Sequence, residues 1–197
     1  MKRIVLIFLL IGVMVFGSLA QMDDMKFGAK AGLTLSKLSI SRDIFGGADE
    51  KFRMGFAGGG IMIMPLNETM AIQGELLYVM KGEKLEDGGE EATIILDVLE
   101  VPVLLKYKAT ESMGFYGGPT FNYILTAKMD TPVGEEDWDD ITKDMSFGLS
   151  FGAQYMMDKI IFDARYDIGL SDIIDSDDTD APEIKMNTIY ITIGYLF

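Results

Sequence analysis

Apolar and polar residues alternate with a period of two in eight segments of the chain between residues 25 and 197. In residues 25–36, apolar side chains such as Phe27 and Leu33 alternate with polar ones such as Lys30 and Thr34. This alternation is typical of a β-strand with one apolar face and one polar face. The segments are residues 25–36, 53–65, 70–81, 94–108, 114–126, 145–155, 159–170 and 188–197.

The connections between these segments are alternately short and long. The short ones are residues 66–69, 110–113 and 157–159, and the long ones are 37–51, 82–92, 128–144 and 171–185. Outer-membrane barrels have short turns on the periplasmic side and long loops outside. We therefore predict an all-β protein, an eight-stranded antiparallel up-and-down transmembrane β-barrel. Its strands, of about 10 to 13 residues, would cross the hydrocarbon layer at a tilt, with both ends of the barrel domain at the short-turn end.

A soluble lipocalin-like barrel is the alternative architecture, and it would bury its apolar face. Aromatic residues near the strand ends on the apolar face favour the membrane instead, because they are typical of interfacial girdles. They are Tyr78, Tyr107, Phe115, Tyr155, Tyr166, Tyr195 and Phe197. In residues 53–65 the faces are less clear, and Gly58, Gly59 and Gly60 predict a bend or bulge rather than a binding loop.

Residues 1–20 have the pattern of a secretory signal peptide: Lys2 and Arg3, an apolar run over 4–16, and small residues at Ser18 and Ala20. An uncleaved membrane anchor is the alternative. We predict export to the outer membrane of a Gram-negative bacterium, with residues 21–197 forming the barrel domain. The final segment ends in Tyr195 and Phe197, which resembles the signal read by the barrel assembly machinery.

The chain has no cysteine and no histidine. Thiol nucleophiles, sulfur metal sites, His-ligated zinc and a Ser-His-Asp relay are therefore excluded. We expect no enzymatic activity, no cofactor and no dedicated metal site.

The acidic residues are concentrated in the long loops. These four loops contain 21 of the 31 acidic residues and 7 of the 17 basic ones, so they carry the whole formal net charge of −14. One rim of the barrel is therefore expected to be acidic, which makes nucleic acid an improbable partner.

Charged residues of both signs fall on the polar face of the segments. They are Lys26, Lys30, Glu75, Glu100, Lys106, Lys108, Asp163, Arg165 and Asp167. Because an eight-stranded lumen is just wide enough for side chains to fill it, we predict a paired charge network that plugs the lumen. Arg165 should pair with Glu75, Glu100, Asp163 or Asp167. A conducting pathway, or an acid–base pair formed by Glu75 and Glu100, is the alternative.

Two acidic clusters in the long loops are candidate sites for a cation or a partner. They are Glu135, Glu136, Asp137, Asp139 and Asp140 around Trp138, and Asp175, Asp177, Asp178 and Asp180. Neither has the spacing of a twelve-residue calcium loop, so solvated loops are the simpler interpretation. Trp138 would either contact a protein or glycan partner or pack against the barrel rim.

Several sequence segments, spread over nearly the whole mature chain, resemble the PorT-like outer-membrane β-barrel family. They are FGAKAGLTLSKL (Phe27–Leu38), LEVPVLLKYK (Leu99–Lys108), GFYGGP (Gly114–Pro119), FGLSFGAQY (Phe147–Tyr155) and DARYDIGL (Asp163–Leu170). The resemblance implies an eight-stranded barrel made by Gram-negative bacteria, and it carries over no catalytic residues to this chain. One branch of that family takes part in secretion. We expect a monomeric scaffold or interaction protein in outer-membrane lipid, with a narrow channel or a secretion component as the alternative.

Overall fold

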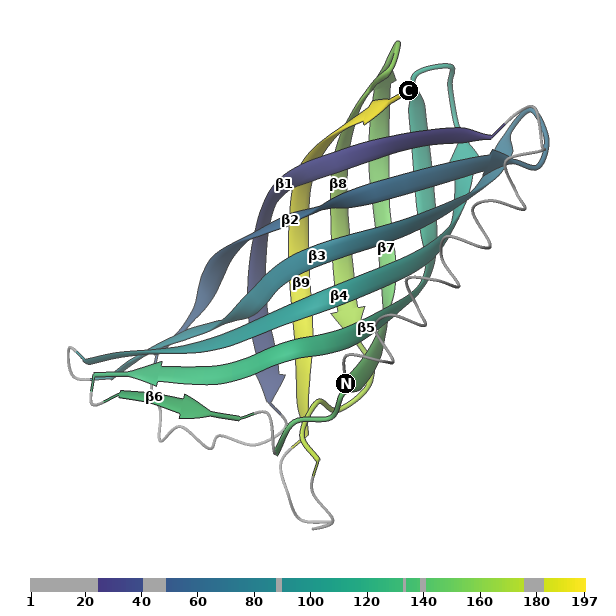
Figure 1. Cartoon of the computed structure of the whole chain (residues 1–197). Helices are drawn as coiled ribbons and strands as arrows, with labels where there is room; N and C mark the ends of the chain where they lie inside the picture. Colours follow the sequence, from purple (N-terminus) through teal and green to yellow (C-terminus); the bar gives the residue numbers. More distant parts are fainter. Residues whose placement is uncertain (1–24, 41–48, 88–89, 133, 139–140, 176–182) are drawn as a thin grey trace.

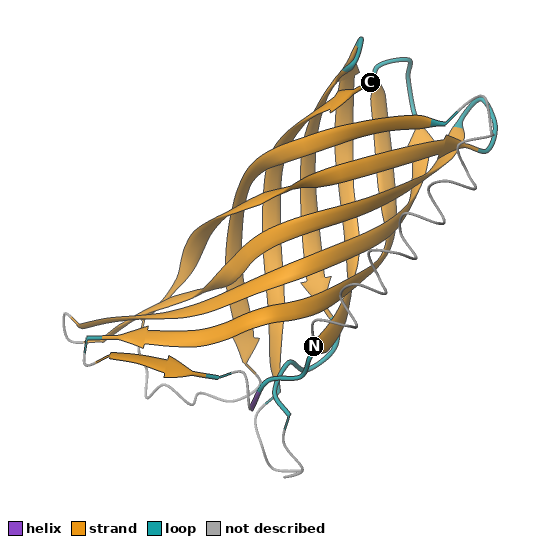
Figure 2. Ribbon diagram, viewed as in Figure 1, coloured by secondary structure: helices purple, strands orange, loops and turns teal. Residues whose placement is uncertain are grey.

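The computed structural model describes residues 25–40, 49–87, 90–132, 134–138, 141–175 and 183–197. They form nine antiparallel strands, eight of which close into a barrel (Figure 1, Figure 2). The strands are β1 (Lys26–Ile40), β2 (Asp49–Pro65), β3 (Met70–Asp87), β4 (Glu90–Lys108), β5 (Met113–Thr131), β6 (Gly134–Asp137), β7 (Met145–Met157), β8 (Ile160–Gly169) and β9 (Ile184–Leu196). Among the described residues the short strand β6 pairs with β5 alone, and the pairing of β1 with β9 completes the ring. The predicted fold class is confirmed, whereas the expected signal peptide, residues 1–20, lies outside the described residues.

Short turns join β2 to β3, β4 to β5 and β7 to β8 at one end of the barrel, at the top of Figure 1. In the first of them the side-chain oxygen of Asn67 accepts hydrogen bonds from the backbone N–H groups of Thr69 (2.9 Å) and Met70 (2.8 Å). Thr110 accepts one from Met113 in the second turn (2.9 Å). Such local bonds fix tight turns. The C-terminus lies at this same end (Figure 1).

The strands are longer at the opposite end than the sequence suggested. The expectation that residues 82–92 form a loop is wrong, because β3 continues to Asp87 and β4 begins at Glu90. Strands β2 to β5 have 17 to 19 residues instead of 10 to 13. An antiparallel sheet is stable with one face packed against other side chains and the other face exposed. Here Leu85 and Ile94 are buried on the inner face, while Lys84 is exposed on the outer one. The extended strands project together with β6 at the lower left of Figure 1.

The outer surface of the barrel is apolar and its interior carries the charges. Leu105, Phe151 and Ile191 are 49, 44 and 60% exposed, whereas Lys30 and Arg165 are 5 and 2% exposed. A soluble barrel would have the opposite distribution, so the lipocalin-like alternative does not apply. Among the residues described, no helix is long and apolar enough to span a membrane.

The side chains buried inside the barrel include two apolar clusters and a set of polar and charged residues. The larger cluster lies toward the long loops and includes Leu77, Ile94 and Ile184, with Trp138 packed against it. A smaller apolar cluster, which includes Ile61, lies toward the short turns. Along the chain, Asp163 and Arg165 lie between Ile161 of the smaller cluster and Ile173 of the larger one. Lys81 on β3, by contrast, lies between Val79 and Leu85 of the larger cluster.

The glycine triplet of β2 does not contain the predicted bulge. The pairing with β1 and β3 is regular across Gly58, Gly59 and Gly60, and the register shifts between Phe52 and Ala57 instead. Gly59 is needed because the adjacent backbone approaches closely: a Cβ there would lie 2.0 Å from the carbonyl oxygen of Leu76.

Candidate functional site in the barrel lumen

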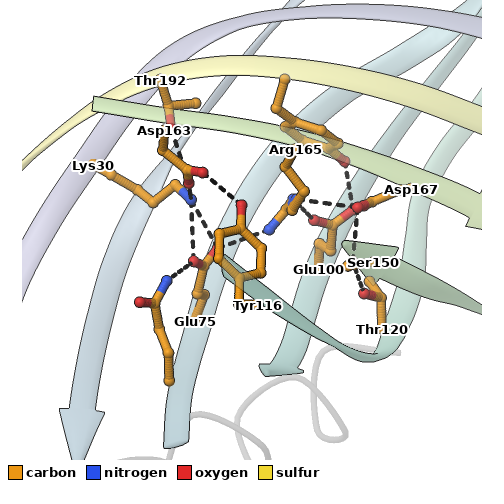
Figure 3. A network of polar contacts seen from close by, with 12 residues as sticks. Lys30, Glu75, Glu100, Tyr116, Thr120, Ser150, Asp163, Arg165, Asp167 and Thr192 are labelled. Atoms are coloured by element: carbon orange, nitrogen blue, oxygen red, sulfur yellow. Dashed lines mark hydrogen bonds and ion pairs between the residues drawn. The ribbon is translucent and has the colours of Figure 1, made fainter. Parts of the chain in front are cut away.

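Arg165 on β8 is the centre of the polar layer. Its Nη1 donates to Oε2 of Glu75 on β3 (2.8 Å), and its Nη2 donates to Oε1 of Glu100 on β4. Its Nε lies 3.1 Å from Oδ1 of Asp167, and its guanidinium carbon lies 4.0 Å from the ring centroid of Tyr190. The Arg165 side chain has no exposed area. It therefore spans the lumen and ties β8 to β3 and β4 (Figure 3).

Lys30 on β1 forms the second part of the network. Its ammonium lies 3.0 Å from Oε1 of Glu75 and 2.5 Å from Oδ2 of Asp163. The other oxygen of Asp163 accepts a hydrogen bond from the hydroxyl of Tyr116 on β5 (2.5 Å), and Gln73 donates to Glu75 (2.6 Å). Glu75 is thus shared by two cations and an amide (Figure 3).

The third part surrounds Glu100. Lys81 on β3 donates to Oε2 of Glu100 (2.5 Å), and the hydroxyl of Tyr190 donates to the same oxygen (2.7 Å). Lys81 also donates to the side-chain oxygen of Asn122 (3.2 Å). Glu100 is fully buried, and cations approach both of its oxygens.

Asp167 extends the network toward β7 and β5. The hydroxyl of Ser150 donates to Oδ1 of Asp167 (2.7 Å) and is itself hydrogen-bonded to the hydroxyl of Thr120. Groups from six barrel strands, β1, β3, β4, β5, β7 and β8, with Tyr190 from β9, thus meet in one layer. Such an arrangement connects the strands of the barrel wall through their inward side chains. It also pairs the buried charges, because an unpaired charge removed from water is costly.

The charge balance of this layer is close to neutral. Four carboxylates are faced by three cations, and the phenol and hydroxyl groups that donate to three of the carboxylates stabilise the remaining negative charge. Glu75 and Glu100 are 4 and 0% exposed and both bind Arg165. An acid–base pair must reach a substrate, and neither carboxylate is open to one in this arrangement.

The structure brings together six of the nine charged residues expected in the lumen: Lys30, Glu75, Glu100, Asp163, Arg165 and Asp167. The other three lie nearer the short turns. Lys106 is buried and donates to Gln154, whereas Lys26 and Lys108 are exposed at the mouth. Arg165 contacts three of its four expected partners, and Asp163 pairs with Lys30 instead.

Six further side chains belong to the network although they were not among the charged residues expected in it, namely Lys81, Tyr116, Tyr190, Gln73, Ser150 and Thr120. The period of two places each of them on the inward face, and this signal could have found them. Tyr116 and Tyr190 differ from the girdle aromatics in that parity directs their rings inward, where each hydroxyl meets a carboxylate.

The structure describes only part of the two acidic loop clusters. Glu135 and Asp137 are exposed on β6, where Glu135 lies 3.7 Å from Lys128, and Asp175 is exposed after β8. Trp138 is half-buried against the outer apolar cluster. The side chain of Glu136, and all of Asp139, Asp140, Asp177, Asp178 and Asp180, lie outside the described residues. Within the described ranges no group of three or more acidic side chains is arranged to hold a metal ion.

The terminal aromatic pair lies on the outer surface at the short-turn end. Tyr195 and Phe197 are 50 and 75% exposed, with their ring centroids 6.2 Å apart. The backbone N–H of Phe197 donates to the carbonyl of Phe27 (2.8 Å), so the last residue is still held by β1.

Comparison with known proteins agrees with this architecture. Ail, the attachment invasion locus protein of Yersinia pestis, is 17% identical with a TM-score of 0.52, and the alignment covers 87% of this chain and 98% of Ail. Neisserial surface protein A is 12% identical with a TM-score of 0.57, covering 87% of this chain and 97% of that protein. At these identities the likeness shows the fold. A search of curated proteins found no match.

The family is shown by sequence. A family model described as the outer membrane protein beta-barrel domain matches residues 19–175, which is most of the chain. The location to which this family points is the outer membrane of a Gram-negative cell. The chain therefore belongs to the outer membrane protein β-barrel domain family.

Proposed function

We propose that the protein is a non-enzymatic scaffold of the outer membrane whose closed barrel presents an acidic outer end to a partner protein or glycan. One observation carries the proposal: the Arg165 side chain, with no exposed area, bridges Glu75, Glu100 and Asp167 across the lumen. Two apolar clusters are also buried inside the barrel. A lumen packed in this way supports anchoring and presentation rather than transport.

The rest of the proposal concerns biogenesis. We propose a cleaved signal peptide over residues 1–20, assembly through Tyr195 and Phe197 by the barrel assembly machinery, and a monomeric barrel in outer-membrane lipid. The exposed terminal aromatics support the assembly step. The phrases LEVPVLLKYK and DARYDIGL support a place in the PorT-like branch.

Partner capture from intact outer membranes tests the proposed role. Glu135, Asp137 and Asp175 are exposed at the long-loop end, and their amide variants (E135Q, D137N, D175N) remove three negative charges there. We expect crosslinking of a specific partner to fall about tenfold, since each rim charge contributes about 0.5 kcal/mol. Quantitative mass spectrometry of the crosslinked proteins and glycans measures this.

The matched control removes three exposed acids at the opposite end through E68Q, E111Q and D158N. Capture should be unchanged in this control. Equal loss in both triple variants, or no adduct above the level in membranes that lack the protein, would contradict a role for the outer end.

A further inference from the structure

The short-turn end contains a cavity of about 290 Å³ that no part of the proposed function uses. It is lined by the turns after β2 and β4 and by the adjoining ends of the strands, including Lys26 on β1 and Lys106 and Lys108 on β4. Short turns face the periplasm in barrels of this class. The cavity therefore opens to the periplasm, below the closed part of the lumen.

These three lysines differ from the lysines of the central network. Lys30 and Lys81 each lie within 2.5 Å of a carboxylate oxygen. Within the described part of the chain, by contrast, Lys26, Lys106 and Lys108 form no ion pair. Three positive charges thus line one cavity without a bound carboxylate.

Lys106 is the most constrained of the three. It is 8% exposed, its side chain passes against Gly114, and its ammonium donates to the side-chain oxygen of Gln154. An ammonium has three donors. The carboxylates of Asp163 and Glu75 in the central network face that of Lys106 from beyond ion-pair distance. Glu68 and Glu111 also line the cavity, but neither pairs with a lysine among the described residues.

The lining selects a class of ligand. Lysine ammonium groups act as point charges that bind phosphate, and three of them line this cavity. The volume is near the lower limit of ligand pockets, so the bound group is small. We propose that this cavity, the periplasmic lysine pocket, binds the phosphate group of an anion.

Titration of inorganic phosphate into the purified full chain, in dodecyl maltoside, tests the pocket. Lys26 and Lys108 are exposed, so K26Q and K108Q should fold, and each should weaken binding about tenfold through the loss of one charge-assisted hydrogen bond. E111Q should tighten binding because it removes a repelling charge. Calorimetry or phosphorus-31 line broadening measures the affinity, which should fall as sodium chloride is added.

Lys159 provides the matched control, because it lies on a short turn at the same end but does not line the cavity. K159Q should leave phosphate affinity unchanged. Absence of phosphate binding to the native chain, or equal weakening by K159Q and K108Q, would overturn the proposal. This test does not depend on whether the barrel conducts or binds an outer partner.

A second arm identifies the source of the phosphate. The titration is repeated in nanodiscs with phosphatidylglycerol and in nanodiscs of a neutral glycolipid. If phosphatidylglycerol weakens the binding of inorganic phosphate, and K108Q abolishes this competition, the site is supported and its ligand is a lipid headgroup. Equal affinity in both nanodiscs supports the site and assigns it to a soluble periplasmic phosphate.

Discussion

Replacement of Arg165 by alanine is expected to lower the free energy of unfolding of the barrel by about 3–5 kcal/mol. The guanidinium is the partner of Glu75, Glu100 and Asp167, and none of these carboxylates can reach water without opening the lumen. Removal of one member of a buried ion network leaves its partners uncompensated, which costs more than the network contributes as a whole. Urea unfolding of the protein in lipid vesicles measures the loss.

Lys185→Ala is the control for this variant, because Lys185 also pairs with a carboxylate, at 2.8 Å from Glu183, but on the exposed surface. Its effect should stay below about 1 kcal/mol, as for other exposed pairs. A loss of unfolding free energy for R165A no larger than that of the control would show that the lumen network does not stabilise the folded barrel.

The second large effect is expected on the outer surface. Val103 faces outward on β4, four residues from the girdle residue Tyr107, and is 43% exposed. Val103→Arg places a charge near the middle of the hydrocarbon layer and should cost about 2–4 kcal/mol. The same unfolding measurement in vesicles applies.

Tyr107→Arg tests the depth dependence. Tyr107 is 55% exposed at the short-turn end, where the bilayer interface is expected, so the cost should be about 0–1 kcal/mol. Similar costs at the two positions would be inconsistent with a lipid-facing surface at Val103.

The fold could be predicted from the sequence because one local property decides most of it. A period of two fixes which side chains share a face, and alternate turn lengths fix which end is which. Asn67 and Thr110 mark two of the short turns through their own hydrogen bonds. The strand ends at the long loops were misjudged because charged residues such as Lys84 and Glu91 were taken as loop signals, although they lie on the outward side of a continuing ladder.

The pairing inside the lumen could be predicted only in part. Parity alone places Lys30, Lys81 and Arg165 inside, but the partner of each depends on how far neighbouring strands are shifted along one another. The register shift between Asp97 and Val98 on β4 is one example, because it changes which residues of β4 and β5 lie at the same level of the barrel. The hydrogen bonds of Tyr116 and Tyr190 to carboxylates were not predicted, because the period of two gives the face on which a side chain lies and not the group that it meets.

Single-channel recording in planar bilayers tests whether the lumen is closed. If the Arg165 network and the two apolar clusters plug the interior, as we propose, the purified full chain should show no step conductance at neutral pH. Reproducible steps from the folded native protein, absent after the sample is boiled, would contradict a plugged barrel.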